Sequence, residues 1–148
     1  MDNDFDFLVG TWTVANRRLA AGAWDEFPGE STCLQVWDGA ANFDQISFPT
    51  KGFRGLTLRL YDPARDEWSL YWASSRDGLL GLPPVVGRFD TDGVGRFHAD
   101  EVHDGRAVRV RYVWDGITAT TARWAQAFSH DAGRTWQTNW VMDFTRTG

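Results

Sequence analysis

Several side chains that could bind another molecule fall on apolar faces of strand-like runs. Arg54 alternates with leucines at positions 56, 58 and 60, and side chains two residues apart in a β-strand share a face. A charged group on an apolar face is costly unless it is paired, so an inward Arg54 would need a carboxylate, from Glu101 or from a ligand. The sequence therefore predicts Arg54 as the anchor of an anionic ligand, with an arginine that reaches out to the rim as the alternative.

Two neutral polar side chains also share faces with large apolar residues. Gln126 stands two residues from Trp124, Tyr112 lies in a valine-rich run, and Trp72 and Trp140 carry the aromatic pattern into two further runs. Aromatic walls with a few polar groups are typical of small-molecule pockets. We expect Trp72, Trp124 and Trp140 to line a cavity in which Tyr112 and Gln126 orient a ligand. Alternatively, the two polar groups are satisfied by each other or by buried water.

Two acidic residues in expected loops are candidates for acid–base catalysis. Glu26 lies between aromatic residues in segment 24–29, and Asp77 lies in the long, apolar segment 75–84, which has the composition of a lid. Loops at a barrel mouth commonly carry recognition, and burial raises the pKa of a carboxyl group. Glu26 and Asp77 are therefore the predicted general acid or base of an enzyme, and are turn residues otherwise.

The histidines and the cysteine argue against metal or thiol chemistry. His98, Asp100 and His103 have the spacing of a two-histidine, one-carboxylate iron site, but strand alternation directs them to the polar outer face. Cys33 is the single cysteine and has no histidine nearby in the sequence. No phosphate-binding loop, dinucleotide fingerprint or Ser-His-Asp arrangement is visible. We expect neither a metal ion nor another cofactor.

Short β-strands joined by tight turns would position these side chains. Asp-Gly pairs at 77–78, 92–93, 104–105 and 115–116 supply the positive φ angles that hairpins need. A meander of this length usually closes on itself, so we predict an all-β fold, a single antiparallel up-and-down β-barrel of about 8–10 strands. A short helical turn is expected within residues 4–9. The strands are expected at 11–19, 31–38, 43–48, 53–61, 67–75, 85–90, 95–102, 106–115, 117–129 and 135–146.

Two further features predict structural contacts. If the first and last strands pair, Arg146 lies across the ring of Trp12 in a cation–π contact. Residues 129–136, Ser-His-Asp-Ala-Gly-Arg-Thr-Trp, match the Asp-box pattern, in which the aspartate caps the amides of a hairpin turn. The pattern occurs once, whereas a β-propeller repeats its signature in every blade.

Length and charge restrict the classes of partner. The 148 residues suit one domain, 1–148, and 20 acidic against 15 basic residues disfavour binding to nucleic acid. No apolar run is long enough to span a membrane, and residues 1–10 lack the features of a signal peptide. A cytoplasmic protein with no membrane partner is expected.

Five segments together resemble a family of uncharacterised bacterial lipocalin-like domains. They are residues 4–12, 55–63, 68–72, 84–89 and 139–144. The resemblance covers nearly the whole chain, implies a calycin-type β-barrel and brings no catalytic residues. The Gly10-x-Trp12 element with a late Arg146 is similar to the lipocalin signature. Haem-binding barrels related to nitrobindin also resemble this plan, but the strand that ends at Arg146 lacks the histidine that haem iron would need.

The sequence favours a protein that binds a small, largely apolar molecule, which can carry a negative charge, in an aromatic-lined cavity. One alternative is a cofactor-independent enzyme of secondary metabolism, of cyclase, isomerase or hydratase type, that uses the same cavity. A second is a structural barrel whose tryptophans fill the interior. A homodimer formed through an outer face is compatible with the chain.

Overall fold

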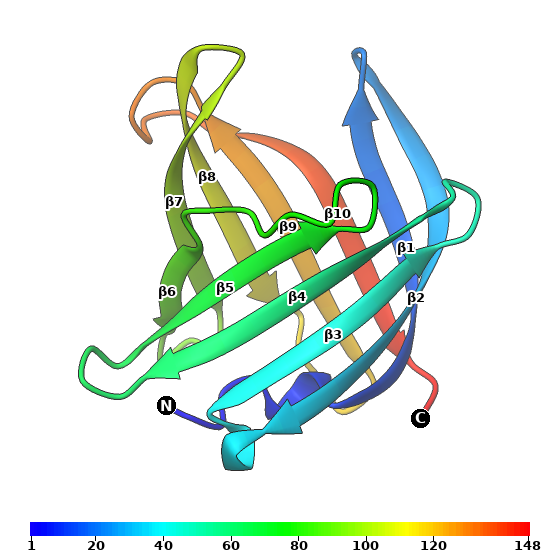
Figure 1. Ribbon diagram of the computed structural model, residues 1–148, viewed down its shortest axis with the longest axis vertical. Helices are drawn as coiled ribbons and strands as arrows, with labels where there is room; N and C mark the ends of the chain where they lie inside the picture. Colours follow the sequence, from blue (N-terminus) through cyan, green and yellow to red (C-terminus); the bar gives the residue numbers. More distant parts are fainter.

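The computed structural model describes residues 1–148, which form one closed β-barrel (Figure 1). Ten antiparallel strands follow one another around the barrel in chain order, and the first pairs with the last. The predicted all-β, up-and-down barrel is confirmed. Its strands are β1 (Gly10–Ala20), β2 (Ala23–Val36), β3 (Ala41–Phe48), β4 (Phe53–Asp62), β5 (Glu67–Ser74), β6 (Val85–Phe89), β7 (Gly95–His103), β8 (Arg106–Asp115), β9 (Thr121–Ser129) and β10 (Gln137–Arg146).

Of the four predicted Asp-Gly hairpins, only 104–105 is a two-residue turn, whereas the other three pairs lie in or at the start of longer connections. Asp104 and Gly105 join β7 to β8 with φ angles of 52° and 76°. Two successive positive φ angles match the right-handed twist of the flanking strands, which fixes their register. The hairpins β1–β2 and β7–β8 lie at the end of the barrel opposite the N-terminal segment (Figure 1). We call this end the mouth.

The contact predicted for the two chain ends is present. Trp12 on β1 pairs with Arg146 on β10, and the Arg146 guanidinium carbon lies 4.2 Å from the centroid of the Trp12 ring. The same guanidinium donates hydrogen bonds of 2.7 Å to the carbonyl of Val9 and 2.5 Å to that of Phe7. Arg146 therefore joins the closing strand pair to the N-terminal segment.

The N-terminal segment plugs the end of the barrel opposite the mouth. The helical turn predicted within residues 4–9 is the 3-10 helix η1 (Asp6–Leu8). Phe5 is fully buried and makes edge contacts with Trp68 and Phe89, whose ring centroids each lie 5.0 Å away. A second 3-10 helix, η2 (Trp37–Gly39), links β2 to β3. Neither short helix, nor any other in the structure, has the length and apolar character needed to cross a membrane.

Segment 24–29 was expected to be a loop, but it forms the first half of strand β2. It pairs with β1 through contacts such as Arg17 with Glu26. Phe27 and Gly29 point inward and are buried, while Glu26 points outward and is exposed. Pro28 misled the sequence-based expectation, because proline is rare in central strands. Here it lies at an outward position.

The face predicted for β4 is wrong. Phe53, Gly55 and Arg59 are buried, whereas Arg54 is exposed on the outer surface. The prediction failed because the outer face of β4 carries three leucines, at positions 56, 58 and 60. The rule that apolar residues of a strand face the core placed these leucines in the interior. Shifting a strand by one residue exchanges its faces, so an inward Arg59 replaces the inward Arg54 that was expected.

Candidate functional site

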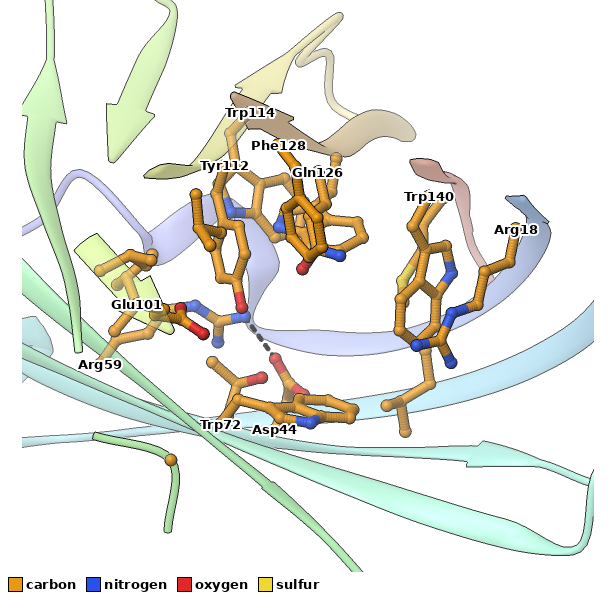
Figure 2. Close-up of a pocket in the computed structure, with 18 of the residues that line it drawn as sticks. Arg18, Asp44, Arg59, Trp72, Glu101, Tyr112, Trp114, Gln126, Phe128 and Trp140 are labelled. Carbon is orange, nitrogen blue, oxygen red and sulfur yellow. Dashed lines mark hydrogen bonds and ion pairs between the residues drawn. The ribbon is translucent and has the colours of Figure 1, made fainter. Parts of the chain in front are cut away.

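A cavity of about 280 Å³ occupies the barrel interior toward the mouth (Figure 2). Its lining comes from all ten strands and from the β5–β6 loop. Thirteen of its 23 lining residues are hydrophobic. The barrel is therefore not filled by its own side chains, as the structural alternative required.

Aromatic rings from four strands form the wall of this cavity. Trp72, Tyr112, Trp124 and Trp140 come from β5, β8, β9 and β10. Trp140 makes edge contacts with Trp124 and Trp72, at centroid distances of 5.7 and 6.3 Å. Tyr112 packs against Trp124 at 5.0 Å. Such edge-to-face contacts are favourable arrangements of aromatic rings, and all four residues line the cavity.

A buried ion pair forms part of the polar lining. Arg59 on β4 is 3% exposed and donates a hydrogen bond of 2.5 Å to Asp44 on β3 and one of 3.1 Å to the amide oxygen of Asn42. Its Nε atom is buried and has no partner within the protein. Figure 2 shows the Arg59–Asp44 pair, with Tyr112 among the surrounding side chains. Because this Nε atom is shielded from the cavity as well as from solvent, a ligand in the cavity does not reach it in this structure.

Three further groups complete the polar side of the cavity. Glu101 and His103 on β7 both line it, and a carboxylate oxygen of Glu101 lies 3.0 Å from Nε2 of His103. The His103 ring stacks on Phe128 at 5.2 Å. Burial, together with the nearby Glu101 charge, raises the pKa of Tyr112 far above its usual range. Tyr112 therefore keeps its proton at neutral pH and can donate a hydrogen bond.

Arg18 lies at the mouth with an unpaired charge. Its guanidinium carbon is 4.1 Å from the centroid of the Trp140 ring. Burial, and then the like charge of Arg76, lowers the pKa of Arg18, and no carboxylate offsets these effects. In Figure 2, Arg18 and Trp140 stand on the opposite side of the cavity from Arg59 and Glu101. Arg18 is exposed at the mouth, so an anionic group of a ligand that enters the cavity could pair with it.

Five of the predicted ligand-binding residues line the cavity together. They are Trp72, Tyr112, Trp124, Gln126 and Trp140. The amide nitrogen of Gln126 donates a 2.9 Å hydrogen bond to Asn139, which lies beside a bulge in β10. Gln126 thus pairs with Asn139 and not with Tyr112, so the two predicted polar groups do not satisfy each other.

The other three predicted site residues lie outside the cavity. Arg54 and Glu26 are exposed on the outer surfaces of β4 and β2. Asp77 is exposed in the β5–β6 loop, where its carboxylate accepts a 3.0 Å hydrogen bond from the amide of Leu79. That contact is an Asx turn, which explains the residue without catalysis. The loop still lines the cavity, through Gly81, Leu82 and Pro83.

The histidines do not converge on a metal site. His98 faces outward and packs against Trp136, at 5.9 Å between ring centroids. Asp100 accepts a hydrogen bond from Arg109 at 2.9 Å. His103 was expected on the outer face, but it points to the cavity, because it lies an odd number of residues from His98. No group of three or more His, Cys, Asp or Glu side chains could hold a metal ion.

The fold is shared with a solved structure, the S-type phycobiliprotein lyase CPES from Guillardia theta. The two chains are 13% identical, with a TM-score of 0.59, and the match covers 97% of this chain and 90% of that chain. At this identity the likeness shows a calycin-like barrel fold and nothing finer. No family model and no curated protein matches the chain. The resemblance to bacterial lipocalin-like domains stays a prediction.

Proposed function

We propose that the barrel binds one small, mainly apolar and anionic molecule in its cavity. The observation that carries this proposal is the cavity of about 280 Å³, walled by Trp72, Trp124 and Trp140, with the unpaired Arg18 beside it. This volume of about 280 Å³ lies just below the usual range of small-molecule pockets, about 300–1,000 Å³, so the ligand is expected to be small. A barrel of the same plan serves as a phycobiliprotein lyase in Guillardia theta, which supports a function beyond that of a scaffold.

The two sides of the cavity would recognise different parts of the ligand. The apolar body packs among the indole rings, and an acceptor group meets the hydroxyl of Tyr112. Arg18 replaces Arg54 as the residue that meets the negative charge. Arg59 is less suited to this task, because Asp44 already neutralises it.

The enzymatic alternative receives no support from the two acids first assigned to it. Glu26 and Asp77 are exposed and outside the cavity, so aromatic residues do not desolvate them there. A binding protein requires only the lining described above. The cytoplasmic location expected from the sequence remains a prediction.

Two fluorescent probes that differ in charge test the proposal. The probes are 8-anilinonaphthalene-1-sulfonate, an apolar anion, and N-phenyl-1-naphthylamine, which has the same ring system without the sulfonate. Energy transfer from tryptophan to each probe measures the affinity of the folded protein. We expect Arg18→Met to weaken the anionic probe about tenfold, or roughly 1.4 kcal/mol, and to leave the neutral probe unchanged.

Two further variants locate the binding. Trp124→Ala removes part of the wall and should weaken both probes. Arg123→Met, which removes an exposed arginine of the outer surface, should weaken neither. The proposal is overturned if neither probe binds the native protein, or if Trp124→Ala leaves both affinities unchanged. Equal losses for both probes with Arg18→Met would overturn the anionic part alone.

A further inference from the structure

The outer face of β2, β3 and β4 carries apolar side chains that no part of the chain covers. Residues paired across adjacent antiparallel strands form rows, and one row runs through Leu34, Phe43 and Leu58. On either side of this row, Val36 and Leu56 are 43% and 42% exposed, and Leu34 itself is 53% exposed. These strands lie side by side in Figure 1. Contiguous exposed apolar residues of this kind mark interaction surfaces.

Opposite charges lie at one end of the same face. A second row runs through Glu30, Ser47 and Arg54, so that an acid and a base flank β3 on opposite sides. Neither charge takes part in any ion pair of the chain. Neighbouring strands are about 4.8 Å apart, so the two side chains start some two strand spacings from each other. At this end, the face therefore carries a negative charge at Glu30 on β2 and a positive charge at Arg54 on β4.

This pattern is complementary to itself. Consider a two-fold axis that lies in the plane of contact and runs roughly parallel to β3. Rotation about this axis places β2 of one copy opposite β4 of the other, and each residue keeps its position along the strand direction. Glu30 then faces Arg54 of the second copy, and Leu34 faces Leu58, with Phe43 near the axis. The symmetry repeats each contact, which gives two intermolecular ion pairs side by side at one end of an apolar contact. Packed sheets prefer strand directions within about 30° of each other, which this axis allows.

We infer that the protein forms a homodimer through the outer face of β2, β3 and β4. The partner is a second copy of this chain because the charges of the face are complementary to those of the same face on another copy. The arrangement that pairs these charges also places Leu34 against Leu58. An unrelated partner would not require this match. The inference does not depend on the proposed function, since the cavity opens at the mouth and this face lies on the outside of the barrel.

Charge reversal with compensation tests the dimer. Sedimentation of the full chain from micromolar to millimolar concentration should show a monomer–dimer equilibrium. Glu30→Arg and Arg54→Glu each place two like-charge pairs in the interface and should each raise the dissociation constant more than tenfold. The double variant exchanges the charges and should restore dimerisation. Asp100→Arg, on β7 and remote from this face, should leave it unchanged.

Each outcome decides the question. Circular dichroism confirms that the variants, all exposed, keep the native fold. A monomer at every concentration overturns the inference. So does a dimer that survives both single reversals, because another surface would then form it. Dissociation by the single variants without recovery in the double variant would reject the two-fold arrangement described here.

Discussion

At the scale of single residues, Arg59 and Asp44 form the most deeply buried ion pair of the protein. Arg59 also lies 5.2 Å from the ring centroid of Phe5, so it connects the plug to the cavity. Moving two charges out of water costs free energy that their attraction offsets only with good hydrogen bonds. Here Asn42 supplies an additional acceptor. Loss of one partner should therefore cost much more than loss of both.

Asp44→Ala is expected to destabilise the protein by about 3–5 kcal/mol, because the Arg59 charge stays buried without its carboxylate. Urea unfolding followed by tryptophan fluorescence measures the change. The double variant Asp44→Ala, Arg59→Met should recover most of the loss. Asp100→Ala is the matched control, since its partner Arg109 is exposed, and should cost less than about 1 kcal/mol. Equal costs for the two single variants would contradict this account of the pair.

At the scale of the strands, the sequence predicted positions better than faces. Asp-Gly turns and aromatic alternation located most strands, because turn chemistry and a period of two are local properties. The face of β4 was wrong, since Leu58 and its neighbours made the outer side as apolar as the inner one. A cross-strand argument could have found the buried pair: Arg59 pairs with Asn42, two residues from Asp44. A diagonal pair of opposite charges is a recognisable pattern once the register is known.

The bulge in β10 also could not be predicted from the sequence. Strict alternation of side chains along a strand would put Trp136 and Trp140 on one face, but the register of β10 shifts between Thr138 and Trp140. Trp136 consequently lies outside, where the Arg111 guanidinium carbon is 4.4 Å from its ring centroid, while Trp140 faces the cavity. A bulge inserts one residue without a distinctive sequence, so alternation cannot reveal it.

Gly55 on β4 controls how far Trp72 on β5 intrudes into the cavity. A methyl group on Gly55 would lie 1.9 Å from Cη2 of Trp72, so the indole rests directly on the glycine. Gly55→Ala should push the ring toward the cavity, weaken both fluorescent probes, and cost about 1–3 kcal/mol through overpacking. Urea unfolding and probe titration measure these effects. Combining Gly55→Ala with Trp72→Phe should restore stability, and native-like behaviour of Gly55→Ala alone would refute the contact.

At the scale of the whole molecule, both ends of the chain meet where the barrel closes. Closure removes free sheet edges, but it depends on pairing the two most distant strands in the sequence. Arg146 stabilises this pairing through contacts with three parts of the barrel. Its guanidinium lies over the Trp12 ring and donates hydrogen bonds to the carbonyls of Phe7 and Val9 in the N-terminal plug. Its Nε donates a 3.0 Å hydrogen bond to the carbonyl of Ala119 in the β8–β9 loop. The sequence predicted the ring contact, but not the carbonyl acceptors, which become visible only in the folded backbone.

Arg146→Met keeps the apolar stem of the side chain and removes its hydrogen bonds, so it should destabilise the protein by about 2–4 kcal/mol. Arg146→Lys should recover only part of this loss, because one ammonium group cannot reproduce the planar fork of donors. Urea unfolding gives the free energies, and hydrogen exchange should show faster opening of the amides between β1 and β10 than in the native protein. Arg123→Met removes an exposed ion pair with Asp143 between β9 and β10 and should cost less than about 1 kcal/mol. If Arg146→Met lowered the free energy of unfolding no more than Arg123→Met does, the backbone hydrogen bonds between β1 and β10 alone would hold the barrel closed.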